Sequence, residues 1–147
     1  MKRGLAALAL LLAACNPGPP PPDMKDPLAV AGAFVSAFNT RDLARMLPLV
    51  DQVNLDAIKE ALAGGPDSEA WRGIFDPEMV EILAREDGKV EGPRYDGREA
   101  LVKVGASGDG DIYAIGLEQG KDQNWLIVEH AVLSEAKYFA LDEKSKH

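Results

Sequence analysis

The hydrophobic period of this chain changes once, near Lys89, and that change limits the folds open to it. Before Lys89, apolar residues recur three or four positions apart, which is the spacing of amphipathic helices. After Lys89 they alternate every second residue between turn sequences, which indicates strands. Helices followed by consecutive strands predict an α+β fold, with N-terminal helices packed on a curved four-stranded antiparallel sheet.

The first expected helix begins at Asp26 and Pro27, because Asp can accept hydrogen bonds from the first amides and Pro tolerates the first turn. It carries one apolar stripe, formed by Val30, Ala31, Phe34, Val35 and Phe38. We expect Thr40 to cap a short second helix and Asn54 to cap a third. The helical half therefore consists of several short helices rather than one long one.

Two further segments of this half are expected to be helical. One covers residues 67–75 around Trp71, and the other begins at the start signal of Asp76 and Pro77. Residues 79–85 fit both helical and strand spacing. The start signal favours a helix there, and the strand remains the alternative.

Four strands are expected after Lys89, at residues 90–95, 99–104, 112–117 and 125–133. Short turn sequences separate them, at residues 96–97, 107–110 and 121–124. Strands joined by such short turns form an antiparallel meander. Both alternating sides are fairly apolar, so we expect one face to pack on the helices and the other to be partly covered.

The start of the chain resembles the leader of a bacterial lipoprotein. Lys2 and Arg3 precede an apolar run over residues 4–14, and the run ends in the lipobox-like sequence Leu12-Ala13-Ala14-Cys15. The run is too short for a spanning helix, which needs about 20 apolar residues. The resemblance implies cleavage between Ala14 and Cys15 and lipidation of Cys15. The alternative, a free buried thiol, is disfavoured because the proline-rich residues 16–22 offer no core to bury it.

The sequence predicts four parts in the chain: a signal peptide (1–14), a lipidated cysteine with a proline-rich tether (15–26), one α+β domain (27–141) and a polar tail (142–147). In an extended polyproline conformation the tether could hold the domain about 30 Å from the lipid. The residue after Cys15 is Asn16, not the Asp that commonly retains lipoproteins in the inner membrane. The resemblance therefore implies the periplasmic side of the outer membrane, if the host is Gram-negative.

The charge of the chain restricts its partners. The net charge is −8, and it becomes −10 once Lys2 and Arg3 leave with the leader. Nucleic acid is excluded as an expected partner, because binding its backbone requires clustered Lys and Arg. We expect contact with the membrane only through the lipid anchor, since anionic head groups repel an acidic domain.

The domain resembles the nuclear transport factor 2-like superfamily over roughly residues 27–133. The likeness lies in an opening helix ending at Phe38-Asn39-Thr40-Arg41-Asp42, in the strand and turn residues 95–104, and in a last strand beginning at Trp125. More narrowly, it is similar to small bacterial lipoproteins of that cone-shaped fold. Enzymes of the superfamily place an acid or base on an inward strand position, which here implies Glu129 or His130 as the candidate, with Tyr95 or Tyr113 as partner.

Alternation along a strand allows only one of Glu129 and His130 to enter the cone. His130 would share its face with Leu126 and Val128, and Glu129 would share its face with Trp125 and Ile127. A structural histidine or a carboxylate at the rim is the favoured interpretation. We therefore assign no catalytic residue.

No metal ligand set or cofactor motif is predicted. Asp109-Gly110-Asp111 resembles the start of a calcium loop, but Ile112 and Tyr113 break that pattern, so a hairpin turn is expected. His147 lies in the tail and leaves His130 as a lone histidine.

The most plausible ligand position is an apolar cone mouth near Trp125. The residues expected to form it are Tyr95, Tyr113, Trp125 and His130. Trp71 is expected to pack in the core.

These features predict a membrane-anchored protein of the cell envelope whose domain binds an envelope protein or a small apolar ligand without catalysis. A filled cone would favour a protein partner, and an open apolar cavity would favour a ligand carrier. The enzymatic alternative is an isomerase-like or dehydratase-like activity. It requires Glu129 or His130 to be buried in a cavity facing a tyrosine.

Overall fold

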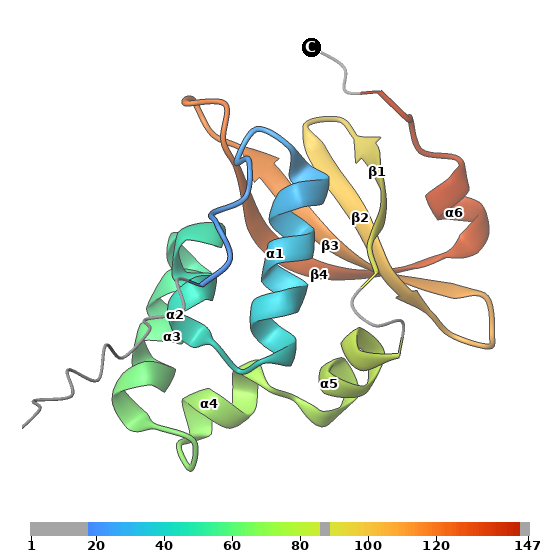
Figure 1. Ribbon diagram of the computed structural model, residues 1–147. Helices are drawn as coiled ribbons and strands as arrows, with labels where there is room; N and C mark the ends of the chain where they lie inside the picture. Colours follow the sequence, from blue (N-terminus) through green and yellow to red (C-terminus); the bar gives the residue numbers. More distant parts are fainter. Residues whose placement is uncertain (1–17, 86–88, 145–147) are drawn as a thin grey trace, which may run out of the picture.

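In the computed structural model, which describes residues 18–85 and 89–144, helices pack against a four-stranded antiparallel sheet (Figure 1). The helices before the sheet are α1 (Pro27–Asn39), α2 (Leu43–Met46), the 3-10 turn η1 (Leu47–Leu49), α3 (Gln52–Gly64), α4 (Glu69–Ile74) and α5 (Pro77–Ala84). The strands are β1 (Glu91–Asp96), β2 (Glu99–Ala106), β3 (Asp111–Gln119) and β4 (Trp125–Ser134), followed by α6 (Glu135–Phe139). The predicted α+β class is confirmed.

Several expected positions fall outside this description. The signal peptide, its cleavage site at Ala14 and the lipidated Cys15 precede residue 18, and His147 lies beyond residue 144. They stay predictions from the sequence.

The predicted helix starts are partly confirmed. Asp26 caps α1 by accepting a hydrogen bond from the Leu28 amide at 2.9 Å, and Asp76 caps α5. The open alternative for residues 79–85 is resolved as helix over most of its length, because α5 extends to Ala84. Asn39 fixes α5 against α1 by donating from its side chain to the Leu83 carbonyl at 3.1 Å.

Two predicted caps are wrong. Asp42, not Thr40, caps α2, because the Thr40 hydroxyl donates to the Ser36 and Ala37 carbonyls and so belongs to the end of α1. Asp51, not Asn54, caps α3 by accepting from the Asn54 amide at 3.1 Å. The Asn54 side chain is instead turned toward the sheet, where it bonds to β4.

The sheet is the expected meander, with strand order β1-β2-β3-β4. Three irregularities interrupt its ladders, and the first lies between Glu91 and Arg94, where β1 pairs with β2. The pairing of β2 with β3 skips Val104, and the pairing of β3 with β4 skips Val128. Each is a bulge, in which an extra residue in one strand shifts the alternation of side chains beyond it.

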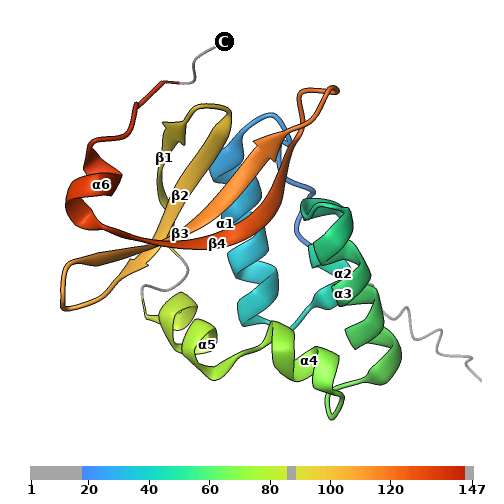
Figure 2. The same cartoon turned by 180° about the vertical axis from the view of Figure 1, so that it is seen from behind.

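Apolar side chains fill both faces of the sheet. On the helical face, Val102, Ile115, Leu117 and Ile127 join α1 and α3 in the main core. On the opposite face, seen in Figure 2, a second cluster contains Leu101, Ile112, Ala114, Leu133 and Tyr138 of α6. The expected partial cover of the second face is therefore provided by α6.

Candidate ligand-binding site

A cavity of about 420 Å³ lies between the helices and β4. Its volume falls in the range of about 300–1,000 Å³ that is typical of small-molecule sites. The buried part of its lining is entirely apolar and consists of Phe34, Phe38, Met46, Val50, Ile58 and Ile127. The molecule therefore has an apolar cavity large enough for a small ligand.

The mouth of the cavity is formed by its exposed lining residues, which are Ala57, Glu60, Gly73, Glu129 and His130. They come from α3, α4 and β4. Ala57 and Gly73 carry almost no side chain, so α3 and α4 leave room between them instead of closing over the cavity. Asn54, Ala70, Ile74 and Met79, which are partly buried, complete the lining.

His130 reaches the cavity because of the bulge in β4. Gly116 pairs with Glu129 and Leu117 pairs with Ile127, so Val128 is the extra residue. The bulge places Ile127 and His130 on the same side of the sheet, and both line the cavity. The strict alternation that grouped His130 with Leu126 and Val128 is wrong, because a bulge reverses which residues face inward.

The bulge itself is held by the start of α3. The Asn54 side-chain amide donates to the Val128 carbonyl at 3.1 Å, and the Asp51 amide donates to the Ile127 carbonyl at 2.9 Å. Val50 forms an isolated parallel bridge with Ile127 next to these bonds. One wall of the cavity is thus attached to the other at the residue that turns His130 inward.

The environment of His130 favours its neutral form. Surrounding protein desolvates the imidazole and lowers its pKa below the ordinary value of 6.5, although the nearby Glu129 carboxylate acts in the opposite direction. The ring lies 6.5 Å from the Phe34 ring, measured between centroids. A neutral imidazole offers one hydrogen-bond donor and one acceptor at the mouth.

Glu129 directs its side chain to the other face of the sheet, where it lies beside Glu99. A Cβ atom on Gly116 would overlap Oε1 of Glu99 and lie 3.0 Å from Cγ of Glu129, so this glycine makes room for the pair. The pKa of Glu99 is raised to about 7, chiefly by burial. A hydrogen bond to Glu129 and the negative charges of Glu129, Glu118 and Asp96 raise it further.

Oε1 of Glu99 is buried and has no hydrogen-bond partner among the described residues when both carboxylates are ionised, since both are then acceptors only. Protonation of Glu99 supplies the missing donor. Sequence reasoning missed this pair, and a glycine in the interior of β3 was the signal that could have indicated it.

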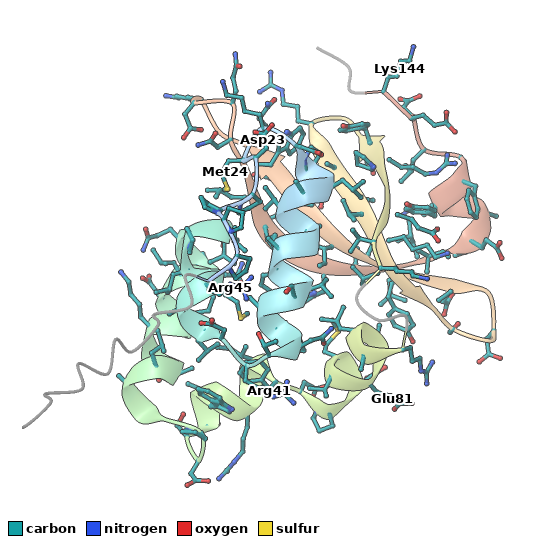
Figure 3. The ribbon with its side chains drawn as sticks, viewed as in Figure 1. Asp23, Met24, Arg41, Arg45, Glu81 and Lys144 are labelled. Carbon is teal, nitrogen blue, oxygen red and sulfur yellow. The ribbon has the colours of Figure 1, made fainter. Side chains whose placement is uncertain are left out.

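The other predicted pocket residues do not line this cavity. Tyr95 and Trp125 pack on each other with ring centroids 6.1 Å apart, and Trp125 is only 4% exposed. The Trp125 amide donates to the Met24 carbonyl at 2.7 Å, on the segment leading into α1 (Figure 3). Tyr113 packs against the main core. Of the four side chains expected at the cone mouth, His130 is the one that lines the cavity.

The remaining candidates have structural roles. Trp71 packs against Phe75 with the rings tilted and their centroids 5.1 Å apart. The Asp109–Asp111 segment leads into β3, and the Ser107 hydroxyl accepts from the Asp109 and Asp111 amides, as in a hairpin turn. Within residues 18–85 and 89–144, no three His, Cys, Asp or Glu side chains are grouped for a metal ion. No helix in the same ranges has both the length and the hydropathy needed to cross a bilayer.

In comparisons with known proteins, no family model, curated protein or solved structure matches the chain. The function of the cavity must therefore be argued from its own residues.

Proposed function

We propose that this chain is a lipid-anchored protein of the cell envelope that binds a small apolar ligand in the cavity between α1, α3, α4 and β4. The observation that carries the proposal is the cavity itself, about 420 Å³ with an apolar buried lining. A domain that acted only through its surface would gain stability by filling this space, since empty apolar volume costs contacts. An open cavity thus favours the carrier over a pure protein-interaction module.

The proposed location depends on the sequence. The lipobox-like residues ending at Cys15 support a lipid anchor, and Asn16 supports sorting to the outer membrane of a Gram-negative host. The helices-then-meander order supports the resemblance to small lipoproteins of the nuclear transport factor 2-like superfamily. An envelope location fits an apolar ligand, because such molecules need a carrier to cross an aqueous compartment.

The noncatalytic role is supported by the positions of Glu129 and His130. An isomerase-like or dehydratase-like enzyme would need one of them buried in a cavity opposite a tyrosine. Glu129 and His130 lie at the exposed mouth, although surrounding protein partly desolvates the His130 ring, and the lining of the cavity in the described residues includes no tyrosine. Ligand binding therefore accounts for this site better than catalysis.

Ligand binding can be tested with N-phenyl-1-naphthylamine, a neutral probe whose fluorescence rises in apolar surroundings. The protein would be the full-length chain carrying Cys15→Ala, which avoids acyl chains. We expect saturable binding that is lost in Ala57→Trp, because an indole at the mouth covers the cavity. Ala63→Trp is the matched control, since Ala63 is exposed on the same helix and does not line the cavity. Equal binding by both variants would contradict the proposal.

The anchor has a separate test. Cys15→Ala in the native host should leave an unprocessed precursor without lipid, and normal processing with membrane retention would contradict the lipoprotein assignment. Labelling with a radioactive fatty acid provides the readout.

A further inference from the structure

The polar residues of the cavity are restricted to the side formed by α3 and β4. They are Asn54 and Glu60 on α3 and His130 on β4, because Glu129, which also lies at the mouth, directs its side chain to the other face of the sheet. The six buried lining residues are apolar, so a bound molecule must place its apolar part inside and its polar end at this mouth. The chemistry of the mouth therefore decides which polar end is accepted.

The mouth carries negative charge and no compensating cation. The cavity lining in the described residues contains neither Lys nor Arg, while Glu60 is exposed at the mouth and forms no ion pair with another described residue. His130 adds no positive charge at neutral pH, because burial lowers its pKa. A carboxylate or phosphate placed here would lose water and meet the negative charge of Glu60 with no cation to neutralise it.

The mouth also offers mainly hydrogen-bond acceptors. The Asn54 amide nitrogen is already occupied, because it donates to Asp51 Oδ1 at 2.6 Å and to the Val128 carbonyl at 3.1 Å. Its amide oxygen, which takes part in no hydrogen bond between described residues, is left to accept. The Glu60 carboxylate accepts only, and neutral His130 adds one further acceptor beside its single donor.

We infer that the cavity selects an apolar molecule whose polar end is a hydrogen-bond donor, a hydroxyl or an amine, and excludes fatty acids and other anions. This inference rests on the proposed function and names its ligand class. Specificity then arises by rejection at the mouth, since the apolar interior accepts any chain that fits.

Three compounds with the same chain and different polar ends test the inference: octanol, octylamine and octanoate. Each would compete with N-phenyl-1-naphthylamine for the full-length Cys15→Ala chain at neutral pH and low ionic strength. We expect octanol and octylamine to displace the probe at concentrations about tenfold lower than octanoate. Repulsion between like charges at a partly exposed mouth lowers the affinity by about a factor of ten.

Glu60→Gln should weaken the binding of octylamine and strengthen that of octanoate. The concentrations at which the two compounds displace the probe should therefore move closer together. Asp56→Asn is the matched control, because it removes one carboxylate from the same helix at a residue outside the cavity lining. In this control, the three compounds should displace the probe in the same order and at the same relative concentrations as in the parent chain.

The outcomes separate this inference from the proposed function. If octanoate competes as well as octanol, or if none of the three displaces a probe that does bind, the ligand class is wrong while the cavity remains a binding site. If the probe itself fails to bind, the proposed function fails and the inference falls with it. Identical shifts in Glu60→Gln and Asp56→Asn would likewise overturn the assigned role of Glu60.

Discussion

The Asn54 side-chain amide donates a hydrogen bond to the main-chain carbonyl of Val128 at 3.1 Å, and this bond joins the first turn of α3 to the bulge of β4. Val128 is the residue at which the inward-facing positions of β4 change, so the bond stabilises the orientation that brings His130 to the cavity. The α3 and β4 walls of the site are connected here by one polar side chain beside the apolar buried part of the lining.

Asn54→Ala should lower the free energy of unfolding by about 1 kcal/mol, because it leaves the bulge carbonyl without its donor while alanine's higher helix propensity offsets part of the loss. Urea denaturation measures the change. Gln52→Ala is the control: Gln52 donates to Asp56 on the exposed surface of the same helix, and its loss should cost less than about 0.5 kcal/mol. Equal losses in the two variants would argue against the role given to Asn54.

The carboxyl pair of Glu99 and Glu129 predicts a pH-dependent stability. The pKa of Glu99 rises from 4.5 to about 7 on folding, so between these values the folded protein holds a proton that the unfolded chain has released. This contribution to the free energy of unfolding is present at pH values below 4.5 and is lost as the pH rises through about 7. Glu99→Gln stays neutral and should remove that loss.

The difference between wild type and Glu99→Gln is the quantity to measure, because His130 acts in the opposite sense. Its lowered pKa makes the folded protein lose stability as the pH falls below 6.5. Thermal denaturation between pH 4.5 and about 7 should show that the stability of Glu99→Gln, relative to wild type, increases with pH. A difference that does not vary with pH would contradict the raised pKa, and Glu78→Gln, exposed on α5, serves as the control.

The imidazole of His130 should titrate below its ordinary pKa of 6.5, because burial is the largest influence on it. Glu129→Gln should lower the pKa further, since it removes the carboxylate that favours the charged ring. Proton NMR of the ring protons measures both values. Glu118→Gln, on the neighbouring strand β3, should leave the titration unchanged, and an unchanged pKa in Glu129→Gln would contradict the assignment.

Gly73 should tolerate a methyl group. It lies in α4 with an ordinary helical backbone, and a Cβ there would meet no atom within 4 Å. Gly73→Ala should therefore raise the free energy of unfolding by about 0.5–1 kcal/mol. Gly97→Ala, by contrast, should lower it by about 1 kcal/mol, because alanine is strained at the positive φ of this turn. Thermal denaturation should show that Gly73→Ala is more stable than wild type and Gly97→Ala less stable.

The sequence predicts the layers of this fold well because they depend on local periodicity. The spacing of Val30, Phe34 and Phe38 requires a buried helical face, and the alternation after Lys89 requires strands, whatever the rest of the chain does. The same holds for the starts at Asp26 and Asp76, where a cap and a proline act within one turn. Such features need no knowledge of tertiary contacts.

The site was less predictable because it depends on how the elements meet. The bulge at Val128 is a property of the pairing between β3 and β4, and it reverses the face of every residue beyond it. The mouth of the cavity is lined by Ala57 of α3 and Gly73 of α4, small residues that have no periodic signal of their own. Trp125, the most conspicuous candidate, is instead covered by the segment around Met24.

The most direct test of the central claim is the position of a bound ligand. Isotope-filtered NOE spectroscopy of the full-length Cys15→Ala chain with octanol would show which methyl groups it touches. The account predicts NOEs from the octyl chain to the buried side chains of Met46, Ile58 and Ile127. NOEs only to the exposed Val53 and Val132, or none at saturating octanol, would contradict it.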